Sequence, residues 1–157
     1  MKPFQKDAYI KLMKYCAYQE RCHAEVEQKL ASLGLYGEEA GEVIVELSRE
    51  GFLDEERFTR AFVRGKFRFK KWGRRKIANE LRQKKISDYC LKRGFEELDE
   101  DEYLATLREL GQNYCQNISG TGNIWAKRKK TGSYLLQKGY EPELVNALLK
   151  ELAEVGF

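Results

Sequence analysis

The sequence predicts an all-α fold, an elongated array of three tandem three-helix repeats. One apolar pattern occurs three times, each copy anchored by a leucine with a second apolar residue five positions later: Leu30 and Leu35, Leu81 and Ile86, Leu135 and Tyr140. The anchors are about 50 residues apart, a period typical of stacked supersecondary units. Only two prolines occur in 157 residues, and apolar residues recur at helical rather than alternating spacing. The repeats are expected at residues 1–53, 54–98 and 99–157.

In the first repeat, residues 7–18 are expected to form a helix because their apolar residues share one face at the spacing i, i+3, i+4 and i+7. Cys22 occupies the N-cap position of the next helix, which Gly34 and Gly37 are expected to close. Gly51 is expected to end the third helix.

In the second repeat, Asp54 is expected to cap the longest helix, residues 55–72, before Gly73 breaks it and residues 74–84 form another. The inner stripe of the long helix is apolar: Phe58, Ala61, Phe62, Gly65, Phe69 and Trp72. Val63 and Phe67 fall outside this stripe and are expected to pack against an adjacent repeat.

A cationic stripe lies beside the apolar one on the long helix: Arg57, Arg60, Arg64, Arg68 and Lys71. Like charges one turn apart repel by a few tenths of a kcal/mol per pair, so this row requires facing anions. Residues 57–93 carry a net charge of +13, whereas the whole chain carries +4. An acidic run, residues 96–102, follows directly and is expected to form a solvated linker.

In the third repeat, residues 101–117 are expected to form a helix with an inward face of Tyr103, Leu104, Leu107, Leu110 and Tyr114. Residues 119–123 are rich in glycine and small polar residues and are expected to form a flexible loop. The following helix, residues 124–138, contains the basic cluster Lys127 to Lys130, and Pro142 starts the last helix.

No pattern in the chain favours catalysis, a cofactor or a metal. Nucleotide-binding glycine loops and zinc-protease motifs are absent, and the single histidine, His23, is expected to be structural. The four cysteines form no CxxC pair and are expected to be free thiols. The N-terminus lacks an apolar signal core, so we expect a cytoplasmic protein with no membrane partner.

The basic residues favour an anion-binding surface, because Lys and Arg side chains that neutralise phosphates release counterions. A solvated face is the alternative interpretation, and a helix-turn-helix regulator is disfavoured because the charge spreads over two repeats. Trp72 and Trp125 are each open to two interpretations, as the end of a core stripe or as a platform for a base. The candidate contact residues are Arg57, Arg60, Arg64, Arg68, Lys70, Lys71, Arg74, Arg75, Lys76, Arg82, Lys84, Lys85, Lys127, Arg128, Lys129 and Lys130.

Residues 51–58, with the sequence GFLDEERF, and residues 73–87, with GRRKI near the start and KIS at the end, resemble the central signature of the RecX family of recombination regulators. Residues 18–30 and 135–140 look like the first and third repeats of that family. The chain departs from the family pattern at Cys22, where serine is usual, at Lys85, where glycine is usual, and at Arg74, where proline follows the glycine.

The resemblance implies a non-enzymatic modulator of the RecA recombinase that lodges in the groove of the RecA filament on single-stranded DNA. It implies inhibition or modulation of ATPase activity, strand exchange and filament growth by a monomer without a cofactor. Direct contact with single-stranded DNA is left open by the resemblance. The alternative is a nucleic-acid-binding helical repeat protein without a recombinase target.

Overall fold

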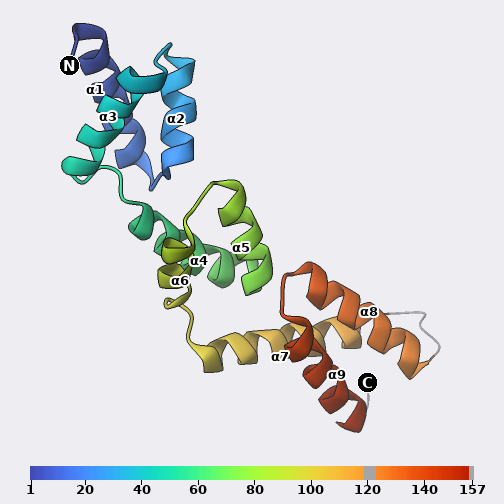
Figure 1. The fold of residues 1–157 in the computed structure, drawn as a ribbon. Helices are drawn as coiled ribbons and strands as arrows, with labels where there is room; N and C mark the ends of the chain where they lie inside the picture. The colour runs from blue at the N-terminus through green and yellow to red at the C-terminus, as the bar shows by residue number, and fades with distance from the viewer. Residues whose placement is uncertain (119–122, 156–157) are drawn as a thin grey trace. The chain divides into compact units, whose positions relative to one another are not determined.

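The computed structural model describes residues 1–118 and 123–155, and over these residues the fold consists of helices without strands (Figure 1). The predicted all-α class is therefore confirmed. The helices are α1 (Pro3–Tyr18), α2 (His23–Ser32), α3 (Gly37–Arg49), α4 (Glu55–Lys70), α5 (Arg74–Gln83), α6 (Asp88–Phe95), α7 (Glu100–Asn117), α8 (Ile124–Gln137) and α9 (Pro142–Val155). The loop predicted at residues 119–123 lies outside the described residues except for Asn123, which caps α8.

The chain divides into two compact units, which are described separately below. Unit 1 comprises Met1–Phe62 and Leu81–Gly94, and unit 2 comprises Val63–Glu80 and Phe95–Phe157. Helix α4 contributes residues to both units. None of the helices in the described ranges is both long and apolar enough to cross a membrane.

In unit 1, helices α1, α2 and α3 pack side by side around an apolar core (Figure 1). The side chains of Leu12, Leu30 and Leu47 are fully buried there. Helix α1 begins four residues earlier than predicted, because Pro3 suits the first turn and Gln5 accepts a hydrogen bond from the backbone N–H of Lys2 at 2.7 Å. The start of α2 is as predicted: the N–H of Cys22 donates to Glu25 Oε1 at 3.0 Å.

In unit 2, helices α7, α8 and α9 pack around two fully buried tyrosines, Tyr103 and Tyr140, whose ring centroids are 5.2 Å apart. The predicted inward face of α7 is partly wrong, because Leu104 is 39% exposed. The buried residues of α7 follow a spacing of four: Tyr103, Leu107, Gly111 and Cys115. At Gly111 the backbone of α7 packs closely against α9, since a Cβ at this position would lie 2.7 Å from Leu148 Cδ2.

The predicted apolar stripe of α4 is also partly wrong. Phe58 is buried as expected, but Phe69 is 79% exposed, while Val63 and Phe67 are buried. At 3.6 residues per turn, Val63 and Phe67 lie on a different side of the helix from Phe58. The buried line of α4 instead runs through Thr59, Val63 and Phe67, which are spaced by four residues, and the line through Phe58 is buried only at its start.

The long helix ends at Lys70 rather than at the predicted Trp72. Lys71 has a φ of +60°, a left-handed conformation that stops the helix before Gly73 is reached. Gly37 was predicted to close α2, but it is the first residue of α3. Asp54 caps α4 as predicted, accepting a hydrogen bond from the N–H of Arg57 at 3.0 Å.

Candidate functional site

Four lysines of unit 2 gather around the segment that joins α4 to α5. Lys66 Nζ lies 5.0 Å and Lys76 Nζ 4.6 Å from the ring centroid of Trp72. Lys138, at the end of α8, donates a hydrogen bond from Nζ to the carbonyl oxygen of Lys70 at 3.0 Å. We call Lys66, Lys70, Trp72, Lys76 and Lys138 the Trp72 cluster. These residues come from three helix ends and lie up to 72 positions apart in the sequence.

Two glycines bring these helix ends together. The N–H of Gly73 donates to the carbonyl oxygen of Lys138 at 2.8 Å, and the N–H of Arg75 donates to that of Gly139 at 2.9 Å. A Cβ on Gly73 would lie 2.4 Å from the carbonyl carbon of Gly139, so no side chain fits there. The hydroxyl of Tyr140 donates to the carbonyl oxygen of Lys71 at 2.8 Å, which holds the left-handed residue in place.

Positive charge accumulates at the Trp72 cluster. Burial, together with the charges of Lys76 and Lys70, lowers the pKa of Lys138 from its ordinary value. In the described part of the chain no carboxylate lies within ion-pair distance of Lys70, Lys76 or Lys138. An anion placed here would relieve the repulsion among the lysines, so the cluster favours binding of phosphate or carboxylate groups.

The first three arginines of the predicted stripe on α4 differ from these lysines, because the chain supplies anions for them. In unit 1, Arg57 Nε donates to both oxygens of Glu20 at 2.7 and 2.9 Å, and Arg60 pairs with Glu56 at 3.1 Å. In unit 2, Arg64 Nη1 pairs with Glu97 Oε1 at 2.9 Å. These three arginines therefore need no external anion to offset their mutual repulsion.

Arg74 of unit 2 is held by two carboxylates and an aromatic ring. Its guanidinium pairs with Glu141 at 2.6 Å and with Glu100, and it lies 3.8 Å from the ring centroid of Tyr103. The predicted solvated linker at residues 96–102 is thus partly wrong: Glu97 and Glu100 bind arginines. Asp99 from the same run caps α7 by accepting a hydrogen bond from the N–H of Glu102 at 2.9 Å.

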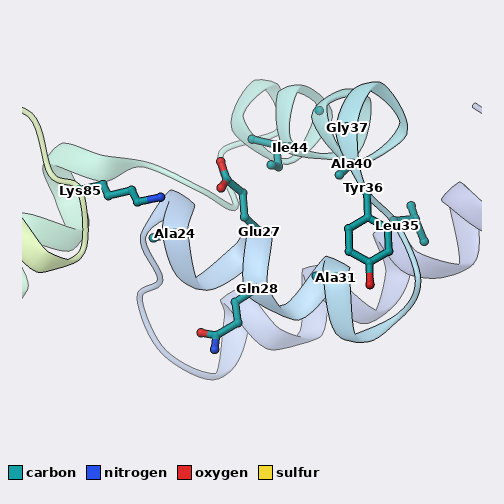
Figure 2. A pocket seen from close by; sticks show the side chains of 11 residues that line it. Ala24, Glu27, Gln28, Ala31, Leu35, Tyr36, Gly37, Ala40, Ile44 and Lys85 are labelled. Atoms are coloured by element: carbon teal, nitrogen blue, oxygen red, sulfur yellow. The ribbon is translucent and has the colours of Figure 1, made fainter.

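The candidate residues at the end of α5 belong to unit 1 and lie in a different setting. Lys84 approaches Glu25 at 3.7 Å, and Arg82 is exposed. Lys85 has a φ of +62°, a conformation that favours glycine. Its side chain lines a pocket of about 550 Å³ beside α2 and α3, where Figure 2 shows it at the same end as Glu27. Because these two residues carry opposite charges, the pocket has no net attraction for an anion.

The second basic cluster lies on α8 in unit 2. Trp125, in the first turn, is 70% exposed, so it is not part of the core. Lys129 Nζ lies 5.3 Å from its ring centroid. Over the described residues, the candidate cations with no carboxylate at ion-pair distance are Arg68, Lys70, Lys71, Arg75, Lys76, Arg82, Lys85, Lys127, Arg128, Lys129 and Lys130.

Sequence reasoning missed Lys66 and Lys138, which complete the Trp72 cluster. Lys138 directly precedes Gly139, but no local signal in the sequence connects that turn with Gly73. The described residues contain no group of histidine, cysteine, aspartate and glutamate side chains that could hold a metal ion. All four cysteines are buried free thiols, and burial raises the pKa of Cys22 to about 11.

Comparisons of the chain with family models, curated proteins and solved structures agree on one family. The model of the second three-helix domain of RecX matches residues 54–93, and that of the third three-helix domain matches residues 100–149. A crystal structure of RecX from Lactobacillus salivarius has the same fold, with a TM-score of 0.85 at 22% identity, over 96% of this chain and 97% of that one.

Curated relatives named regulatory protein RecX match along most of the chain. That of Halorhodospira halophila is 30% identical over 90% of this chain and 84% of the relative. That of Enterococcus faecalis is 26% identical over 90% of this chain but only 53% of the relative, so the chain spans about half the length of some relatives that it matches. RecX proteins are regulators and not enzymes. With both three-helix domains matched and a relative at 30% identity, the chain belongs to the RecX family.

Proposed function

We propose that this chain binds the RecA filament assembled on single-stranded DNA and inhibits or modulates its ATPase activity, strand exchange and filament growth. The proposal places the chain in the cytoplasm as a monomer. Membership of the RecX family supports it, because the family resemblance implies a modulator of RecA. The observation that supports the proposal at the level of residues is the convergence of Lys70, Lys76 and Lys138, for which the described residues offer no carboxylate at ion-pair distance.

The Trp72 cluster is preorganised to bind an acidic partner. Lys70 and Lys76 lie on helix ends that hydrogen bonds hold together, so little backbone entropy is lost when an anion binds. The neighbouring arginines Arg64 and Arg74 are engaged with carboxylates of the chain, which keeps those carboxylates from neutralising the lysines. Both DNA phosphates and an acidic protein surface provide suitable anions.

The exposed side chain of Phe69 adds an apolar element beside these cations. It is 79% exposed and lies between Arg68 and Lys70 in the sequence of α4. An exposed aromatic next to unpaired cations is typical of surfaces that bind proteins or single strands. It supports a contact surface on the second half of α4.

The decisive measurement is the ATPase rate of RecA on single-stranded DNA at increasing concentrations of this protein. Inhibition well below the concentration of DNA nucleotides supports binding to the filament. Inhibition only when the protein saturates the DNA would support the alternative, a nucleic-acid-binding repeat protein that competes for the strand.

The residues are tested with the double variant Lys70→Gln, Lys76→Gln. We expect the half-inhibitory concentration to rise by about 5- to 30-fold, since two cationic contacts contribute roughly 0.5–1 kcal/mol each. The matched control is Lys11→Gln, Lys14→Gln, which removes the same charge from exposed positions of α1. Equal inhibition by the two double variants would rule out the Trp72 cluster as the contact surface.

Salt dependence gives an independent check on the charge. If about six phosphates are neutralised, affinity should fall on the order of 10³-fold between 50 and 200 mM salt. An affinity that is constant over this range would contradict an electrostatic contact.

A further inference from the structure

A pocket of about 330 Å³ lies between α8 and α9 in unit 2. Trp125, which is 70% exposed, and Leu136, which is 45% exposed, contribute apolar walls. Leu149, which is buried, forms part of the lining beside Gly132, where a Cβ would lie 3.1 Å from Leu149 Cδ1. The absence of a side chain at Gly132 therefore leaves open the space that the two exposed apolar residues flank.

The rim of this pocket is cationic. Arg128 and Lys129 line it, and no carboxylate is among its lining residues. Lys127 and Lys130 flank them in the sequence, so four successive residues of α8 are positively charged. Within the described ranges none of the four has a carboxylate at ion-pair distance. A ligand with an apolar, flat part and an anionic part would satisfy both features at once.

The geometry points to an unpaired nucleobase of single-stranded DNA as the occupant of this pocket, stacked on Trp125, with the adjoining phosphates on Arg128 and Lys129. The volume is near the lower end of the roughly 300–1,000 Å³ of small-ligand sites. Stacking on an aromatic ring requires no particular base, because every base has a π face. A base inside a duplex is already stacked and paired, so the site selects single strands.

This inference deepens the proposed function and rests on the part of it that places single-stranded DNA beside the chain. It assigns α8 a direct contact with single-stranded DNA, separate from the Trp72 cluster. It also gives the exposed side chain of Trp125 a function, as the ring on which a base stacks. The sequence had left Trp125 open between the core and a base platform; its exposure rules out the core.

The test uses the full chain without RecA and two labelled probes of equal length, a 12-nucleotide oligothymidylate and an abasic strand with the same phosphates. We expect the oligothymidylate to bind more tightly by about 5- to 140-fold, which corresponds to the roughly 1–3 kcal/mol of one base on an aromatic ring. Trp125→Ala should abolish that preference and leave the affinity for the abasic strand unchanged. Trp125→Phe, which keeps a ring, should preserve most of it.

Tyr18→Ala is the control, since it removes another exposed aromatic, 83% exposed, from α1. It should change neither affinity. In a Trp72→Phe background Trp125 is the sole tryptophan, and oligothymidylate should quench its fluorescence more than the abasic strand does.

Three results would overturn the inference: no preference for bases in the natural protein, a preference that survives in Trp125→Ala, or an equal loss of affinity for both probes in that variant. Trp125→Phe keeps the test informative if the alanine variant is poorly folded by circular dichroism. Inhibition of the RecA ATPase that persists without any binding to oligothymidylate would overturn this inference alone and leave the proposed function standing.

Discussion

Gly73→Ala should destabilise unit 2 strongly, because the added Cβ would lie 2.4 Å from the carbonyl carbon and 2.5 Å from the carbonyl oxygen of Gly139. Both obstacles are backbone atoms, so the two turns must separate. Overpacking of this kind costs about 1–3 kcal/mol, and the two hydrogen bonds that join the turns contribute about 0.5–1.5 kcal/mol each. The expected loss is therefore about 2–6 kcal/mol, a large part of the stability of a typical domain.

The assay is guanidinium unfolding followed by tryptophan fluorescence. Both tryptophans, Trp72 and Trp125, belong to unit 2, so the fluorescence reports on that unit. Gly65→Ala is the matched control, because Gly65 lies within α4 in the same unit with no atom within 4 Å of an added Cβ. It should stabilise the protein by about 0.5–1 kcal/mol. Equal midpoints for Gly73→Ala and the natural protein would refute the close approach of the two turns.

Leu81→Ala should cost about 2–5 kcal/mol by thermal or chemical unfolding, because Leu81 is fully buried, whereas Leu104→Ala should cost under about 1 kcal/mol; similar losses would contradict the assigned burial. Tyr103→Phe should cost about 1–3 kcal/mol, since the buried hydroxyl accepts from the N–H of Arg74 at 2.9 Å and donates to Glu141; an unchanged unfolding midpoint would argue against these hydrogen bonds. Burial raises the pKa of Cys22 to about 11, so folding favours its protonated form. The resulting stability is present below about pH 9 and is lost as the pH rises through 11, which the melting temperature from pH 8 to 11.5 should report. The buried thiols should also react with a thiol reagent only on unfolding; rapid reaction of the native protein would contradict their burial.

The all-α class and most helix boundaries could be predicted from local patterns. Asp54 and Pro142 mark helix starts through backbone preferences that need no tertiary contact, and the anchors Leu30, Leu81 and Leu135 are all fully buried, as their repetition predicted. Local spacing was less successful on α4. Its buried line runs through Thr59, Val63 and Phe67, so a stripe drawn through Phe58 placed the exposed Phe69 inside.

The family, the basic character and the list of candidate cations follow from the sequence alone. Only the tertiary structure decides which of those cations carry unbalanced charge, because Coulomb attraction depends on distance in space. Arg64 meets Glu97 across 33 positions, and Arg74 meets Glu141 across 67. The lysines around Trp72 are brought together by two turns that approach so closely that only glycine fits at Gly73, a packing contact that no short-range pattern contains.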